Sequence, residues 1–175
     1  MHHTLICHPD TPARAITALR AAVSRENATG LLLHYILEGG VKHLVPSPFA
    51  EATQRRADDL WQHTCFEAFV KPQGGEAYLE FNVAPALDWQ AYALDGYREG
   101  RRPADIPQPP KFERVVTSGR LELRARFEGL PPAAWRLALT AVVAERDGTL
   151  SYWALRHAPG KPDFHHPDGF ALELP

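Results

Sequence analysis

Apolar positions along the chain fall in short segments, and in several of them apolar and polar residues alternate. Alternation with a period of two is typical of a strand that buries one face. The clearest case is residues 120–127 (RLELRARF), where Leu121, Leu123, Ala125 and Phe127 share one face. This segment predicts a strand with an apolar side and a strongly charged side.

The same reasoning predicts most of the remaining secondary structure. Strands are expected at residues 30–38, 64–71, 77–83, 135–144, 150–157 and 170–174. The Asp147-Gly148 step favours a tight hairpin between two of these strands. Residues 12–26 are ambiguous, because their alanines suit a helix while Leu19, Ala21 and Val23 fit a strand. We therefore expect an all-β protein, folded as an antiparallel β-sandwich.

The strands at 64–71 and 77–83 lie on either side of Gly74-Gly75, and their patterns predict a register. Residues opposite each other in an antiparallel pair point to the same side. Burying the apolar positions of both strands predicts the pairs Cys65–Asn82, Phe66–Phe81, Glu67–Glu80 and Ala68–Leu79. The other face then carries Cys65, Glu67, Phe69, Tyr78, Glu80 and Asn82. A slip of one residue would mix the two faces, so the parity is well determined.

Two glutamates that face each other repel, and something must offset that repulsion. An arginine, a bound cation or a ligand rich in hydroxyl groups would do so. The alternative is a solvated sheet face with Glu67 and Glu80 turned into water. The neighbouring aromatics Phe69 and Tyr78 favour a covered or ligand-facing surface.

Composition narrows the class of protein. A length of 175 residues predicts a single domain, residues 1–175, with one long proline-rich loop around residues 101–111. A net charge of -2 argues against nucleic-acid binding. The N-terminal pattern lacks a secretory leader, and no apolar run is long enough for a membrane span, so we expect a cytoplasmic protein. Its two cysteines, Cys7 and Cys65, do not form a disulfide scaffold.

Several short motifs together resemble a known family. They are residues 59–69 (DLWQHTCFEAF), 78–85 (YLEFNVAP), 89–92 (WQAY), 96–100 (GYREG), 152–157 (YWALRH) and 162–165 (PDFH). This set resembles the bacterial DOMON-like proteins, which are similar to family-nine carbohydrate-binding modules. The resemblance implies an antiparallel β-sandwich. Related DOMON domains bind haem or sugar, whereas the DOMON-like branch is functionally uncharacterised.

Sugar binding is the first functional hypothesis. Sugars stack on aromatic rings and hydrogen-bond to carboxylates and amides, so Trp61, Trp89 and Trp153 are the candidate platform. The candidate polar partners are Glu67, Glu80, Asn82, Arg98, His157 and His165. The structural alternative is that these tryptophans lie in the core of the sandwich, where tryptophan is usually found.

Haem and metal binding are weaker hypotheses. Haem-binding DOMON cytochromes use a methionine and a histidine as axial ligands, and here the sole methionine is Met1. A pair of histidines would have to replace that arrangement, drawn from His63, His157, His165 and His166. For a metal ion, the candidate ligands are Asp163, His165, His166 and Asp168, which also suit hydrogen bonds within their own loop. We therefore expect no cofactor.

Catalysis is the remaining alternative. Glu67 and Glu80 offer the two carboxyl groups of a glycosidase. His63 and Cys65 point the same way along a strand but lie about 7 Å apart, too far for direct proton transfer. The sequence thus favours a non-enzymatic module that binds a small polar ligand or a carbohydrate. The runner-up is a structural or protein-interaction module whose polar cluster only stabilises the sandwich.

Overall fold

The computed structural model describes residues 1–175, in which thirteen strands form two antiparallel sheets. One sheet has five strands, in the order β1 (His3–Thr4), β3 (Ile16–Asn27), β4 (Gly30–Gly39), β10 (Arg120–Phe127) and β9 (Lys111–Val116). The other has eight: β2 (Ile6–Cys7), β12 (Leu150–Ala154), β11 (Trp135–Ala144), β5 (Cys65–Pro72), β6 (Tyr78–Val83), β7 (Trp89–Leu94) and β8 (Arg102–Pro103), with β13 (Leu172–Leu174) paired to β11. The expected all-β sandwich is confirmed.

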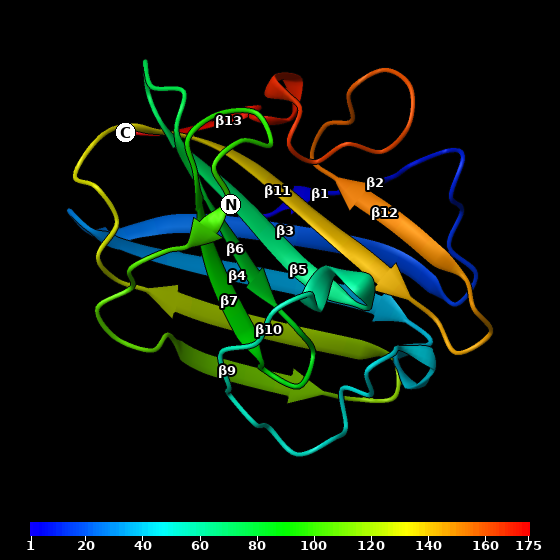
Figure 1. Ribbon diagram of the computed structural model, residues 1–175. Helices are drawn as coiled ribbons and strands as arrows, with labels where there is room; N and C mark the ends of the chain where they lie inside the picture. Colours follow the sequence, from blue (N-terminus) through cyan, green and yellow to red (C-terminus); the bar gives the residue numbers. More distant parts are fainter.

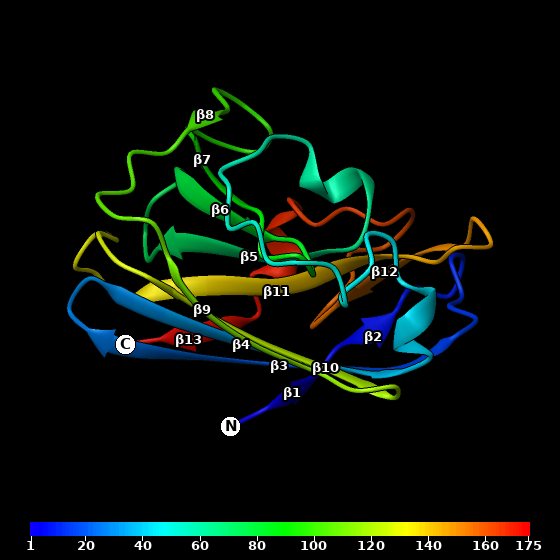
Figure 2. The ribbon, with the colours of Figure 1, turned by 90° about the horizontal axis from the view of Figure 1, so that it is seen from below.

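The two sheets pack face to face, as Figures 1 and 2 show. Their facing sides supply one core of 30 buried hydrophobic residues. The alternation predicted for β10 places Leu121, Leu123, Ala125 and Phe127 in this core. Burial of apolar area is the dominant favourable contribution to folding, so this shared core holds the sheets together.

Three short 3-10 helices lie in the connections: η1 (Val41–His43), η2 (Leu60–Gln62) and η3 (Pro167–Gly169). In Figure 2, η2 and the loop after β12 lie on the outer side of the eight-stranded sheet. A second, smaller hydrophobic cluster also forms on that outer side, from Phe69, Tyr78, Tyr92, Leu94, Ala138 and Phe170. No helix is both long and apolar enough to span a bilayer.

Most predicted strands are present, with changes at their ends. The ambiguous N-terminal segment is a strand, β3, rather than a helix. The strand predicted over 150–157 ends at Ala154, and the one predicted over 170–174 begins at Leu172. The Asp147-Gly148 hairpin joins β11 and β12 as expected, with Gly148 at φ +89. The proline-rich loop contains β8 and carries the chain from the eight-stranded sheet to β9 in the other sheet.

The predicted register of β5 and β6 is wrong by two residues. Glu67 pairs with Asn82 rather than with Glu80, and Glu80 pairs with Phe69. Likewise Phe66 pairs with Val83, Ala68 with Phe81 and Val70 with Leu79, and Asn82 is not opposite Cys65. The buried and outer faces are unchanged because a shift of two preserves parity. The turn decides between the two registers: Gly74 has φ +82, and the Gly75 N–H donates to the Pro72 carbonyl at 3.1 Å.

Candidate functional site

The centre of the site is a row of polar side chains across the outer face of the eight-stranded sheet. Glu67 on β5 lies between Thr140 on β11 and Asn82 on β6. Glu80 is two positions before Asn82 on the same strand, diagonal to Glu67. From the core side, the Tyr35 hydroxyl donates to the main-chain carbonyl of Glu67 at 2.6 Å and fixes this part of β5. Two carboxyl groups therefore lie side by side on a rigid floor.

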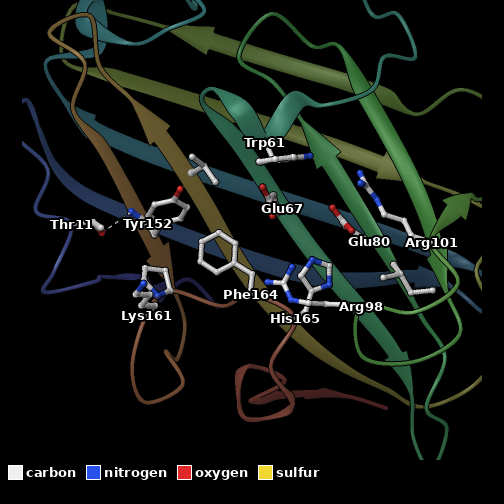
Figure 3. Close-up of a pocket in the computed structure, with 13 residues that line it drawn as sticks. Thr11, Trp61, Glu67, Glu80, Arg98, Arg101, Tyr152, Lys161, Phe164 and His165 are labelled. Atoms are coloured by element: carbon white, nitrogen blue, oxygen red, sulfur yellow. Dashed lines mark hydrogen bonds between the residues drawn. The ribbon is translucent and has the colours of Figure 1, made fainter.

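A cavity of about 490 Å³ opens above this floor (Figure 3). Its walls come from segments far apart in the sequence: the N-terminal region, the loop with η2, the turn after β7, and the loop after β12. The lining residues are Thr11, Trp61, Glu67, Glu80, Leu94, Arg98, Arg101, Val142, Tyr152, Lys161, Pro162, Phe164 and His165. The mixture of carboxyl, basic, hydroxyl and aromatic groups is that of a site for a small polar molecule.

Several polar atoms of the floor have no hydrogen-bond partner. Glu67 and Glu80 are each only 3% exposed. The Asn82 amide donates to one oxygen of Glu80 at 2.8 Å. Four buried oxygens have no partner: Glu67 Oε1, Glu80 Oε2, Asn82 Oδ1 and Thr140 Oγ1. Because buried polar atoms normally have partners, such a group of unpartnered oxygens marks a surface that a hydrogen-bonding ligand is expected to cover.

Burial raises the pKa of both acids. For Glu67, desolvation is the main cause, the nearby Glu80 raises the pKa further, and Arg101 opposes both effects. Desolvation likewise raises the pKa of Glu80, while the hydrogen bond from Asn82 opposes it. Cys65 is also fully buried, which raises its thiol pKa well above the ordinary value. A thiol in that state is a poor nucleophile, so the geometry does not support the His63–Cys65 alternative.

A tight turn after β7 places Arg98 in the wall. Arg98 has φ 57, a left-handed conformation that is uncommon for a residue with a side chain and is frequent at functional sites. Its guanidinium forms an ion pair with Asp163 at 2.7 Å, which joins the turn to the loop after β12. The Arg98 N–H donates to the Tyr78 hydroxyl at 3.3 Å, and that hydroxyl lies 2.8 Å from His165 Nδ1. Burial lowers the pKa of His165 to about 4, so its ring is neutral near pH 7.

Trp61 forms the opposite wall. It belongs to η2 and is 44% exposed, and the residue that precedes η2 is Asp59, which has φ 59. The loop is held to the sheet by Asp58, whose carboxylate accepts hydrogen bonds from the Tyr92 hydroxyl at 2.7 Å and the Gln90 amide at 2.9 Å. In Figure 3, the Trp61 side chain lies above Glu67. An aromatic face thus borders the acidic floor beside Glu67.

The structure separates the predicted site residues into two groups. Trp61, Glu67, Glu80, Arg98 and His165 line the cavity, and Asn82, beside Glu80 on β6, donates a hydrogen bond to it. The other candidates are elsewhere. Trp89 and Trp153 are 5% and 6% exposed and lie in the main core, which is the structural alternative considered for them. His157 hydrogen-bonds the Ile6 carbonyl and stacks edge-on against His8.

Five polar or aromatic lining residues were not among the predicted site residues: Thr11, Arg101, Tyr152, Lys161 and Phe164. Only Tyr152 lies on a predicted strand, where alternation places its side chain on the face opposite to those of Ser151 and Trp153. Arg101 and Lys161 lie in loops, where no periodicity indicates which way a side chain faces. Only the tertiary structure brings Arg101 and Lys161 to the cavity.

The four candidate metal ligands near the C-terminus have other partners. Asp163 pairs with Arg98 and also accepts from the Tyr97 hydroxyl. His166 Nδ1 accepts from the Asp168 N–H and caps η3. No group of three or more histidine, cysteine, aspartate or glutamate side chains is arranged to hold a metal ion. These residues serve mainly to fix their own loop.

The raised carboxyl pKa values predict a pH-dependent stability difference. An acid whose pKa is higher in the folded state favours folding below its unfolded pKa, and that contribution is lost as pH rises towards the folded value. Glu80→Gln removes one such group. The stability of this variant relative to the wild type should therefore increase between about pH 5 and pH 8. Urea denaturation across that range measures it.

The exposed Glu113 provides the control for this measurement, since it lies on the other sheet in an ion pair with Arg124. Glu113→Gln should shift stability by a nearly constant amount over the same pH range. A flat difference for Glu80→Gln as well would show that Glu80 is ionised in the folded protein and in contact with solvent.

No protein-family model and no curated protein matches the sequence. Two solved structures are similar in fold. A "putative carbohydrate-binding protein" from Bacteroides uniformis has a TM-score of 0.67 and 15% identity, covering 97% of this chain and 83% of that chain. A carbohydrate-binding module of family 9 (CBM9) from Caldicellulosiruptor kristjanssonii, in complex with glucose, has a TM-score of 0.51 and 14% identity, covering 93% and 78%.

The chain has a CBM9-like fold. Identities of 14% and 15% establish the likeness of the folds alone. The CBM9-like fold agrees with the sandwich expected from the alternating strands and with the resemblance to family-nine modules. The structural neighbours are described as carbohydrate-binding.

Proposed function

We propose that this protein is a non-enzymatic module that binds a small saccharide in the cavity above Glu67 and Glu80. The observation that carries the proposal is the floor of the cavity, where buried carboxyl oxygens of both residues have no donor. Sugar hydroxyls are donors of the right kind, and several of them sit on adjacent carbons. A ligand of this class would satisfy the floor without introducing a new buried charge.

The walls suit the same ligand. Trp61 supplies an exposed indole face above Glu67, and the C–H face of a pyranose ring packs well on such a surface. Tyr152 and Thr11 add hydroxyl groups at the other side of the cavity. Its volume of about 490 Å³ falls within the roughly 300–1,000 Å³ typical of small-molecule sites. The carbohydrate-binding description of both structural neighbours supports this assignment.

The arrangement of the acids favours binding over hydrolysis. In a glycosidase, two carboxyl groups flank the scissile bond. Here Glu67 and Glu80 lie diagonal to each other on one sheet face, and both contact the cavity from below. Such a floor can hold two hydroxyl groups of one ring, but it does not surround a glycosidic bond.

Calorimetric titration with glucose, galactose, mannose, xylose and their disaccharides tests the proposal. Saturable binding of at least one sugar is expected, together with a change in intrinsic fluorescence. Because Trp89, Trp135 and Trp153 are buried, that change reports Trp61. Phe49→Ala, which removes an exposed aromatic residue outside the cavity, should bind normally. Absence of heat and of a fluorescence change for every sugar, neutral or acidic, would overturn the proposal.

A further inference from the structure

Two basic side chains at the cavity have no acidic partner. Arg98 also lines the cavity, but Asp163 already neutralises it at 2.7 Å. Arg101 and Lys161 form no ion pair, and neither donates a hydrogen bond to any protein group. Most other arginines of the chain are paired with carboxylates or donate to carbonyl groups. Arg146, Arg156, Lys42 and Lys111 are unpaired as well, but of the unpaired basic residues only Arg101 and Lys161 line the cavity.

The position of Arg101 is well defined although its guanidinium N–H groups donate no hydrogen bond within the protein. Its guanidinium stacks over the Tyr92 ring, with the guanidinium carbon 3.7 Å from the ring centroid. Tyr92 is itself held by the hydrogen bond to Asp58. Figure 3 shows the guanidinium in the wall near Glu80, on the same side of the cavity as the edge of Trp61. A stacked guanidinium that keeps its N–H groups free is preorganised to receive an anion.

Lys161 lies across the cavity from Arg101, beside Tyr152 (Figure 3). Its ammonium group adds positive charge at the other wall. Since Lys161 and Arg101 lie in loops at opposite walls of the cavity, positive charge is present on both sides of its opening. Such a field attracts anions and raises their local concentration.

The acids on the floor cancel this charge only when both are ionised. Three basic side chains and two carboxyl groups line the cavity, and Asp163 accounts for the charge of Arg98. Burial of both acids raises the pKa of Glu67 and of Glu80, which favours uptake of a proton by the pair. With both acids ionised, the two carboxylates balance Arg101 and Lys161, and each proton taken up by the pair makes the cavity more positive.

We propose that the preferred ligand is an anionic sugar, whose hydroxyl groups bind Glu67 and Glu80 and whose carboxylate or phosphate group binds Arg101. This inference rests on the proposed saccharide function and specifies its ligand class. A guanidinium binds carboxylate and phosphate oxygens through two parallel N–H donors, which gives orientation as well as attraction. Lys161 strengthens the attraction through its charge. The anionic group thereby fixes which ring hydroxyls reach the floor.

Matched pairs of sugars that differ at one carbon provide the test. Calorimetry compares glucose with glucuronic acid and glucose 6-phosphate, and galactose with galacturonic acid. At low salt, at least one anionic member should bind about tenfold more tightly than its neutral partner. The advantage should shrink markedly at about 0.5 M salt, where charges are screened over a few ångströms. Glucuronic acid and glucose 6-phosphate separate a carboxylate ligand from a phosphate ligand.

Variants locate the anion. Arg101→Gln should remove most of the preference for the anionic sugar, and Arg101→Lys should restore only part of it because lysine lacks the two-donor geometry. Lys161→Gln should reduce the preference for the anionic sugar by a smaller factor than Arg101→Gln, because Lys161 contributes charge without the two-donor geometry. Arg156→Gln and Lys42→Gln are the controls, since both residues lie outside the cavity and carry no ion pair.

The outcomes separate the two proposals. If neutral sugars bind and their anionic partners bind no more tightly, the ligand-class inference is wrong and the saccharide function stands. If the preference exists but survives Arg101→Gln, the assignment of the anion to Arg101 is wrong. If no sugar of either kind binds, the proposed function itself fails.

Discussion

Glu67→Gln is expected to stabilise the protein and, in the same molecule, to weaken saccharide binding at least tenfold. Stability should rise because Glu67 is buried beside Glu80, has an oxygen without a donor, and forms no ion pair. Glutamine is neutral without taking up a proton and adds an amide donor beside Glu80, which together is worth about 1 kcal/mol near pH 7. Binding should fall because the amide of glutamine replaces one of the two carboxyl oxygens with a donor, and loss of one buried hydrogen bond to the ligand costs about 1–3 kcal/mol. Urea denaturation and calorimetry on the same preparation measure the two effects.

Glu145 offers a matched control, because it is also a buried glutamate. It lies in the connection between β11 and β12. It is 5% exposed, but both of its oxygens have partners: they accept the N–H groups of Arg14 and Ala15 at 3.0 and 2.8 Å. Glu145→Gln should cost about 1–3 kcal/mol, because one of those N–H groups would then face an amide donor, and should leave sugar binding intact.

We therefore expect Glu67→Gln and Glu145→Gln to change the stability of the protein in opposite directions. A large loss of stability in Glu67→Gln would mean that Glu67 has a structural role, and it would favour the reading of this cluster as a device that only holds the sandwich together. Gain of stability with loss of binding is the pattern of a group retained for a ligand at a cost to the fold.

The β5–β6 hairpin shows how far sequence patterns reach. Alternation determines which residues share a face, so Glu67 and Glu80 were correctly expected on the outer side together. It does not determine the register, because a shift of two keeps every apolar side chain buried. The turn at Gly74 selects the register, and its geometry is not encoded in the periodicity. The acids are consequently diagonal neighbours instead of a directly opposed pair.

The walls of the cavity were less predictable than its floor. Trp61 and Arg98 lie in segments with left-handed residues at Asp59 and Arg98, and their positions depend on contacts with distant loops. Arg101 reaches the acids only because Tyr92 and Asp58 hold the surrounding segments. Loop side chains have no period to follow, so residue type alone identified some of them and missed others.

One sheet serves two purposes through its two faces. Phe66, Ala68 and Phe81 pack inward against the five-stranded sheet, and the alternate positions of the same strands present Glu67 and Glu80 to the cavity. The packed inner face holds β5 and β6 rigid, which fixes the spacing of the acids. Rigid strands are the more accurate support for a binding site, while the loops supply the variable walls.

The tryptophans provide the strongest contrast between these two roles. Trp89→Ala is expected to destabilise the protein by about 3–5 kcal/mol, because it removes a large side chain from the core and leaves a cavity against Phe127. Trp61→Ala should change stability by no more than about 0.5 kcal/mol, because Trp61 is 44% exposed in a short helix. It should instead weaken saccharide binding about tenfold through loss of the stacking surface.

Thermal denaturation and calorimetry of both variants separate the two tryptophans. Trp89→Ala is measured for binding at a temperature where it remains folded, and its sugar affinity should then stay within about twofold of the wild type. Equal losses of stability in both variants would place Trp61 in the core of the fold. Unchanged sugar affinity in Trp61→Ala would show that Trp61 does not contribute to binding. Recognition would then depend on the acids of the floor and the basic side chains around it.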